Sequence, residues 1–291
     1  MSHTITTIPI SVCLAEIEKK VGAHGSWQTT NEPQREFLEK TYTGDCQDRS
    51  KLTEKELSFE VSHEADVINT FLASKNFKIK LDPFVEPTDF GVASVLDVSV
   101  EWKVAGKKAS FAINKQQYEA VRMDADDIEI FENSHGHPIV RLPTKSGDVV
   151  TMSVVDRVLS GFALKETAAS FDACQTRSYA FSALKIPMIH LDQEEDISFF
   201  KKMKIQGTDT LGDAIIIQAF QQTRFRLNEL GARAESAVAM GMMRCSAASR
   251  PLPELVIDRP FVISITRPGM VSPLFTAYVT EQDWKNPGSL G

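Results

Sequence analysis

The sequence predicts an α+β fold, because its helix-forming and strand-forming segments are grouped along the chain and do not alternate. Helical spacing of apolar residues dominates residues 1–74, whereas most later segments are rich in β-branched residues and alternate as strands do. Such grouping is not that of a doubly wound parallel sheet. The 291 residues contain no internal repeat, low-complexity tract or linker, so we expect one domain, residues 1–291.

The helices are predicted from apolar residues that recur every three or four positions. In residues 11–21, Val12 and Ile17 belong to such a stripe, and Gly22 provides the stop signal. The further helices are expected at residues 35–42, at 63–74 with Val67, Ile68, Phe71 and Leu72 on the buried face, at 158–171 and at 196–205.

The strands are predicted from alternating patterns bounded by turn residues. Pro187 cannot donate a backbone hydrogen bond, so the strand that contains it is expected at a sheet edge or a bulge. The last two strands should form a closing hairpin. The predicted strands are residues 91–102, 109–123, 137–143, 148–155, 182–191, 214–227, 260–267 and 272–281.

Composition excludes several classes of protein. The net charge of −7 argues against a nucleic-acid-binding surface, and no apolar run is long enough for a membrane helix. The first residues show no signal peptide, so we expect a cytoplasmic protein or one secreted without a leader. The four cysteines are widely spaced, which is typical of free thiols in a reducing compartment.

No motif indicates an enzyme, a metal or a cofactor. Neither of the common glycine-rich phosphate loops occurs. His135 and His137 have no clustered partner at zinc-ligand spacing, and the acidic residues 124–127 lack the glycine and the closing glutamate of a calcium loop, so both are interpreted as solvated turns. Cys46 has no recognisable base beside it.

The last third of the chain resembles the serpins, a superfamily of serine protease inhibitors. Residues 255–265, "LVIDRPFVISI", match the C-terminal signature of that family through Asp258, Arg259, Pro260 and Phe261. Residues 272–279 resemble its final core strand. Residues 228–239, "NELGARAESAVA", resemble the hinge of its reactive-centre loop, with Glu229, Gly231 and Ala234 as the matching residues.

Weaker similarity extends back to residue 11 and implies the architecture. A serpin has helices around a central, mostly antiparallel sheet A, with further sheets B and C. This chain is shorter than usual, so the resemblance implies a compact version that lacks the first helix and some later helices and strands. A virus-type serpin would fit such a compact form. Residues 91–102 and 214–227 correspond to the two strands that part to admit the loop, with Asp97 and Gln221 at the centre of that seam.

The resemblance implies that the loop, about residues 231–250, is bait for a serine protease or a cysteine protease. After cleavage, the loop would insert into sheet A and distort the attached protease. The family's spacing puts the cleaved bond between Cys245 and Ser246; a shift of one residue would put Arg244 before it, and Arg250 is a third candidate.

The hinge has the alternation that an inserting strand requires. Side chains of a strand point alternately to two faces, and a charge on the buried face would slow insertion. Both charges, Arg233 and Glu235, fall on the outward face. The inward set is Ala232, Ala234, Ser236, Val238 and Met240.

We therefore expect a monomeric protease inhibitor that acts without nucleic acid, membrane or cofactor. Two alternatives remain at this stage. One is a binding or immune-modulating protein that keeps the scaffold but does not trap proteases, which the short length favours. The other is a structural or storage protein, which only the ordinary composition supports.

Overall fold

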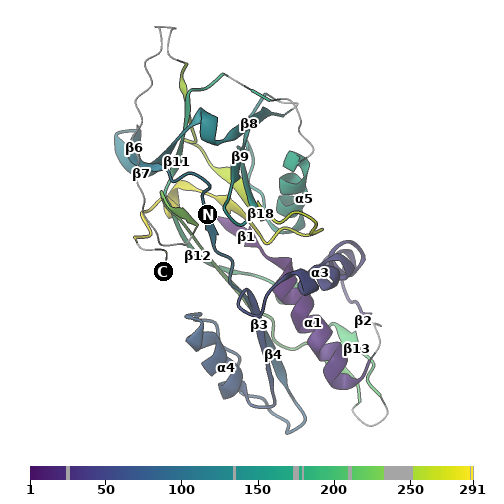
Figure 1. The fold of residues 1–291 in the computed structure, drawn as a ribbon. Coiled ribbons are helices and arrows are strands. Elements are labelled where there is room, and N and C mark those ends of the chain that lie inside the picture. Colours follow the sequence, from purple (N-terminus) through teal and green to yellow (C-terminus); the bar gives the residue numbers. More distant parts are fainter. Residues whose placement is uncertain are drawn as a thin grey trace.

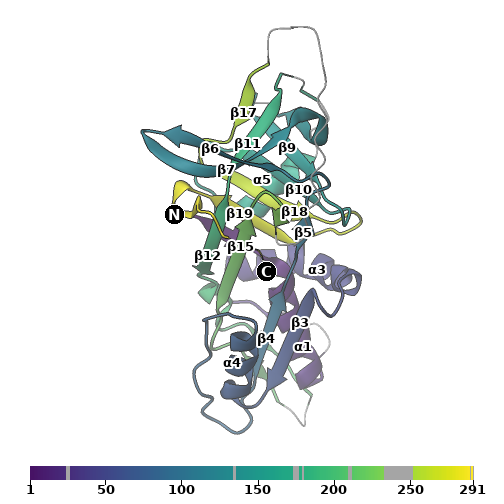
Figure 2. The same cartoon turned by 60° about the vertical axis from the view of Figure 1, so that its left-hand side comes forward.

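The computed structural model describes residues 1–23, 27–133, 136–172, 177–178, 180–208, 212–232, 252–288 and 290. The molecule is elongated (Figure 1), with β-sheets in its upper part and with helix α1 and the β3–β4 ladder at its lower end. In both views this ladder lies between α1 and α4 (Figure 2).

The helix at the N-terminus is confirmed and is longer than predicted. Helix α1 spans Thr7–Val21 and ends at Gly22, whose φ of 68° is readily adopted by glycine. The predicted segment 35–42 lies inside a longer helical run, and Val67 of α4 is 40% exposed, so its assignment to the buried face was wrong. The other helical elements are α2 (Glu32–Phe37), the π-turn Leu38–Tyr42, α3 (Thr43–Asp48), α4 (Ala65–Ser74), α5 (Gly161–Asp172) and the 3-10 turns Arg49–Lys51, Ala125–Asp127, Ser198–Phe200 and Glu281–Asp283.

The helix predicted at residues 196–205 is wrong. Only the 3-10 turn Ser198–Phe200 forms, and Lys202 has a φ of 72°, which no α-helix tolerates. The Lys202 backbone N–H donates to the carbonyl of Ile216 at 2.8 Å, and residues 204–205 form the short strand β13 (Lys204–Ile205). Pairing with a segment that is distant in sequence therefore replaces the local helical bonds.

An antiparallel six-stranded sheet forms the middle of the molecule. Its strand order is β1-β19-β18-β10-β9-β8, and the predicted closing hairpin is confirmed as β18 and β19. Helix α5 covers one face, where Leu164 and Phe171 pack against Ile139 and Val262. The strands are β1 (His3–Ile5), β8 (Glu129–Glu132), β9 (Pro138–Pro143), β10 (Val149–Val154), β18 (Phe261–Thr266) and β19 (Phe275–Val279).

A second sheet has four strands in the order β17-β11-β7-β6. The single strand predicted at residues 109–123 is a hairpin, because Asn114 and Lys115 both have positive φ and form a turn. The predicted strand at 182–191 also divides, at Met188, into two strands that belong to different sheets. The strands are β6 (Lys107–Ile113), β7 (Gln116–Asp124), β11 (Ala183–Pro187) and β17 (Glu254–Val256).

The strands of the predicted central sheet form two separate ladders. One ladder pairs β3 (Leu57–Ser62) with β4 (Gly91–Leu96), and the other pairs β12 (Ile189–Glu195) with β15 (Gln221–Leu227). Within the described residues, no strand pairing joins β4 to β15. The two ladders are instead linked at one end, where β5 (Val100–Glu101) pairs with β16 (Gly231–Ala232).

Both strands of the predicted seam are therefore interrupted. Residues 97–99 separate β4 from β5, and the strand predicted at 214–227 consists of β14 (Ala214–Ile215) and β15. Strand β14 leaves the seam because it pairs with β13, which in turn pairs with β2 (Trp27–Gln28).

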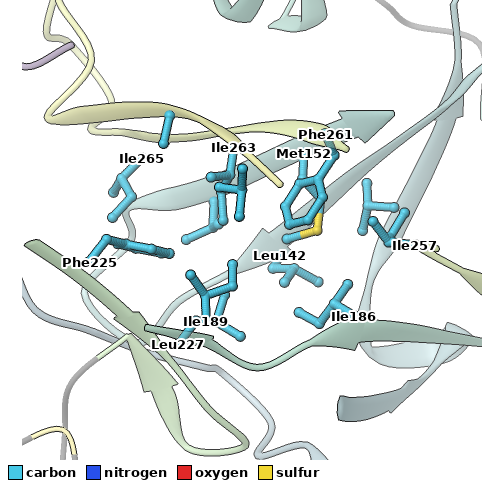
Figure 3. Close-up of a cluster of buried hydrophobic side chains, with 14 of the residues drawn as sticks. Leu142, Met152, Ile186, Ile189, Phe225, Leu227, Ile257, Phe261, Ile263 and Ile265 are labelled. Carbon is cyan, nitrogen blue, oxygen red and sulfur yellow. The ribbon is translucent and has the colours of Figure 1, made fainter. Parts of the chain in front are cut away.

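The main hydrophobic core lies between the six-stranded sheet and the strands around β11, β12 and β15 (Figure 3). Phe225 of β15 stacks on Phe275 of β19 with ring centroids 4.5 Å apart. Leu227 and Ile189 are buried in the same cluster. One face of β15 is thus held by the core, while its edge toward β4 remains without a strand partner in the described structure.

Candidate functional site

The predicted hinge begins in a tight turn at the end of β15. The Asn228 N–H donates to the Gly231 carbonyl at 3.0 Å, and the Asn228 side-chain oxygen accepts from the Leu230 N–H at 2.9 Å. The indole of buried Trp102 donates to the Asn228 carbonyl at 3.0 Å, and the Trp102 backbone N–H donates to the Leu230 carbonyl at 3.2 Å. Trp102 thus fixes the point at which the loop leaves β15.

Gly231 occupies a position that no other residue could take without a shift of the backbone. Its φ is 154°, and a Cβ atom there would lie 2.3 Å from the Val100 carbonyl oxygen and 2.9 Å from the Glu101 Cα. This close approach lets β16 pair with β5 in antiparallel register, with Gly231 opposite Glu101 and Ala232 opposite Val100.

Glu229 ties the hinge to the neighbouring hairpin. Its carboxylate lies 3.3 Å from the Lys108 ammonium at the start of β6, and its carbonyl accepts from the Gly106 N–H at 2.8 Å. The Glu229 side chain is 19% exposed, whereas that of Lys108 is 71% exposed, so solvent weakens this ion pair. Glu229 positions the backbone mainly through its carbonyl.

The two polar residues predicted at the centre of the seam contact different parts of the chain. Asp97 is exposed, and its backbone N–H donates to the Glu56 carbonyl at 2.7 Å. The Gln221 side-chain amide donates to the Thr6 carbonyl at 2.7 Å. A buried Asp97 would require a compensating partner, but exposure of its carboxylate removes that cost.

A cavity of about 440 Å³ occupies the lower part of the seam. Helix α1 forms one wall, β4 a second, and residues 214–225 a third. Strand insertion between β4 and β15 would therefore enter a region that is open in this structure.

The signature residues form the entry to β18. Asp258 and Arg259 are exposed, and the Arg259 guanidinium lies 3.8 Å from Asp156. The Pro260 carbonyl accepts from the Val155 N–H at 3.4 Å, and the Phe261 side chain is fully buried as the first residue of the strand. The apolar end of the motif thus anchors the core, and the charged end faces solvent.

The remaining site predictions lie outside the described residues. These are the hinge residues Ala234 and Ser236, the proposed bond between Cys245 and Ser246, and the alternative Arg244; of Ala232, the structure describes the backbone only. Sequence reasoning missed Trp102 and Asn228. Their signal was weak, because the two residues are 126 positions apart and meet only in the folded chain.

The described residues contain no group of three histidine, cysteine or acidic side chains that could hold a metal ion. His137 forms a hydrogen bond with Asp156 at 2.9 Å, and His135 lies outside the described residues. Burial raises the pKa of the Cys13 thiol to about 12, which makes it a poor nucleophile near neutral pH. In the part of the chain that is described, no helix is long and apolar enough to cross a membrane.

No protein-family model matches the chain, and no curated protein is similar to it in sequence. Solved structures are similar in fold. A highly specific serpin, Serpin48 of the insect Tenebrio molitor, is 17% identical and has a TM-score of 0.58, with 96% of this chain and 91% of that chain covered.

Two other structures show the same similarity. A serpin from Schistosoma mansoni is 11% identical with a TM-score of 0.58, and the match covers 96% of this chain and 95% of that one. Thyroxine-binding globulin, solved in complex with thyroxine, is 12% identical with a TM-score of 0.57, and the match covers 96% and 92%. The chain therefore has a serpin fold, in the reduced α+β form that its sequence predicts.

Proposed function

We propose that this chain is a protease inhibitor whose loop, residues 231–250, is cleaved and then inserts as a new strand between β4 and β15. The observation that carries the proposal is the β5–β16 pairing. The first two loop residues already lie antiparallel to β5, at the end of a seam whose two strands are not paired with each other in the described structure.

Continuing this register gives the inserted strand a defined orientation. In an antiparallel pair, each step forward along the loop corresponds to one step back from Val100 toward β4. Ala234 is then opposite Val98, and Ser236 is opposite Leu96. Val98 and Leu96 pack against the main core. Residues directly opposite each other in a sheet share a face, so the even-numbered loop residues would face that core. This is the small, uncharged set that the sequence places inward.

The same extrapolation accounts for the outward charges. The Asn228–Gly231 bridge relates the loop to β15, and continuing it brings Glu235 opposite Arg224. The Arg224 guanidinium lies over the Phe77 ring at 4.6 Å, and it has no ion pair in the described structure. Insertion would supply Arg224 with a carboxylate, which would favour the inserted state.

A protease forms an acyl intermediate with its own serine or cysteine while it cuts the loop. Insertion before hydrolysis of that intermediate would carry the attached protease along the seam. We expect the inhibitor to act as a monomer, and the proposed mechanism requires neither catalytic activity nor a cofactor of the chain itself.

The alternative is a binding protein that keeps the fold and does not trap proteases. Thyroxine-binding globulin shows that a chain of similar fold binds a small molecule, so the fold does not decide between the two functions. The observation that favours the alternative is the seam cavity. Its volume of about 440 Å³ is within the range that is common for ligand sites.

The test is incubation of the purified chain with a panel of serine and cysteine proteases, followed by denaturing electrophoresis. Inhibition by trapping predicts a covalent complex that survives denaturation with at least one protease and is absent when the catalytic serine or cysteine of that protease is replaced. Cleavage of the loop by every protease without a covalent complex would contradict the proposal and favour the binding protein.

A further inference from the structure

One face of helix α1 lines the seam cavity. Ile10, Cys13, Ile17 and Val21 follow one another at intervals of three or four residues, so they form one stripe along the helix. All four line the seam cavity. The Cys13 thiol contacts the Val92 carbonyl of β4 at 3.8 Å, and Val21 is 3% exposed, so protein covers part of the stripe and the cavity borders the rest.

The cavity forms a channel along α1. Its lining residues on α1 extend from Thr6 to Val21, a distance of ~22 Å for a helix with a rise of 1.5 Å per residue. The volume of the cavity is about 440 Å³. A wall of that length can contact an extended molecule.

The other walls of the channel are mainly apolar. Phe77, Ile79, Leu81 and Phe84, from the segment after α4, line it together with Val92 of β4. Three further lining residues are large, apolar and open to solvent: Ile215 is 55% exposed, Ile217 56% and Phe220 45%. Exposed apolar side chains beside an apolar channel are typical of the entrance to a ligand site.

Two cations line the channel without an ion pair in the described structure, exposed Lys80 and half-buried Arg224. The Arg224 Nη2 donates to the Lys75 carbonyl at 2.8 Å, but its Nε is buried and has no hydrogen-bond partner in the described structure. A buried donor of a charged group is costly to leave unpaired. A carboxylate is the group that a guanidinium binds most favourably.

We propose that the seam cavity binds a long-chain fatty acid, with its aliphatic chain along the α1 stripe and its carboxylate at Arg224. The channel supplies apolar contact over the length of such a chain, and Arg224 supplies the single charged contact that the head group needs. This inference concerns the uncut chain and does not depend on protease inhibition.

Ser94 offers a variant that closes the channel. Ser94 lines the cavity from β4, and its hydroxyl is buried without a hydrogen-bond partner in the described structure. The Ser94→Phe variant would place a large ring in the channel, whereas Ser94→Ala would remove the same hydroxyl and leave the space open. Comparison of the two variants distinguishes the effect of filling the channel from the effect of removing the hydroxyl.

Titration calorimetry of the full, uncut chain with hexadecanoic acid tests the proposal. We expect one molecule bound per chain, an affinity unchanged within threefold in Ser94→Ala, and a loss of at least about tenfold in Ser94→Phe. Absence of binding to the unchanged chain, or equal affinities of the two variants, would overturn it.

The head-group contact is tested with hexadecanol and Arg224→Gln. The substitution should weaken binding of the acid at least about tenfold and leave binding of the alcohol unchanged. If the substitution weakened binding of the acid and of the alcohol equally, Arg224 would not be the partner of the carboxylate. Phosphatidylcholine vesicles distinguish the lipid source, and binding to vesicles without binding to the free acid would contradict a fatty-acid site.

A second matched pair covers the case in which Ser94→Phe does not fold. Ile217→Glu puts a charge at the entrance, and Val158→Glu puts the same charge on an apolar residue that is 66% exposed and does not line the cavity. Only Ile217→Glu should weaken binding of hexadecanoic acid, by at least about threefold. Equal affinities of these two variants would place the bound acid elsewhere.

Discussion

Gly231 is the residue whose backbone geometry most directly determines how the loop begins. A side chain there would collide with the Val100 carbonyl, which no rotamer change could relieve. We predict that Gly231→Ala lowers the free energy of unfolding by about 1–3 kcal/mol, because backbone at the hinge must shift or remain strained. Urea denaturation of the two proteins measures the difference.

Gly147 provides the control for this substitution. It also has a positive φ, 88°, but a Cβ atom there would meet no other atom within 4 Å. Gly147→Ala should therefore show only the intrinsic cost of the left-handed conformation, about 1 kcal/mol. If the two substitutions proved equally destabilising, close approach to β5 would not be the reason for glycine at position 231.

A second residue-scale prediction concerns Arg267, which joins two acidic residues from different parts of the chain. Its guanidinium donates to Glu56 at 2.6 Å and to buried Asp148 at 2.8 and 3.1 Å. The hydrogen bond from Arg267 lowers the pKa of Glu56 from 4.5 to about 2. Because the folded-state pKa is depressed, the stabilisation is present above pH 4.5 and is lost as the pH falls toward 2.

We predict that Glu56→Gln lowers the free energy of unfolding at pH 7 by about 1–3 kcal/mol, and that the difference from the unchanged chain largely disappears near pH 2. The control is Glu60→Gln, since Glu60 is half-buried on β3, just after the turn that holds Glu56, and has no ion pair in the described structure. Denaturation curves at several pH values provide the test. A difference that persisted at pH 2 would rule out ionisation of Glu56 as its cause.

At the scale of elements, the correctly predicted segments are those whose structure follows from a local sequence pattern. Helix α1 combines a helical stripe with a terminal glycine, and β18 and β19 are apolar strands joined by a short connection. The errors occur where distant pairing decides the structure. Strand β13 forms at the end of a predicted helix because it pairs with β14 and β2.

The candidate site was predictable only in part for the same reason. The motif around Gly231 can be recognised in sequence, but its conformation depends on β5, which is 130 residues earlier. The contacts of Trp102 and Arg224 likewise join segments that are separated along the chain. A sequence shows which residue types are present. The cavity, in contrast, forms because α1, β4 and residues 214–225 leave a space between them in the folded chain.

The proposed alternation of the inserting strand gives a prediction at the element scale. Ala234→Arg would put a charge on the face that meets Val98 and the core, and an unpaired buried charge costs several kcal/mol. We predict at least a tenfold loss of covalent protease complex relative to cleaved chain, measured by denaturing electrophoresis.

Ala237→Arg is the matched control, because the same register puts residue 237 on the outward face. It should retain most of the covalent complex. Equal loss of complex in the two variants would refute the assigned register, even if the chain still inhibits a protease.

At the scale of the whole molecule, the seam connects the two proposals. An inserted strand would pair with β4 and β15, cover the α1 stripe and bring Glu235 to Arg224. The fatty acid would occupy the same channel and the same guanidinium. Loop insertion and fatty-acid binding should therefore exclude each other, and the bound acid should slow insertion after cleavage.

The last prediction is that cutting the loop near Cys245 stabilises the chain and releases the fatty acid. Insertion would add strand hydrogen bonds worth about 1 kcal/mol each and bury Val238 and Met240, a gain of order 10 kcal/mol. At about 2–4 °C per kcal/mol, the melting temperature should rise by tens of degrees. Calorimetry of cut and uncut chains, each titrated with hexadecanoic acid, measures both effects.

The cut Ala234→Arg variant is the control, since it should neither gain stability nor lose the acid. If the cut, unsubstituted chain kept both its original melting temperature and its affinity for the acid, the loop would remain outside the sheet and the binding-protein function would be favoured. If the melting temperature rose while the acid stayed bound, the ligand and the inserted strand would occupy different sites.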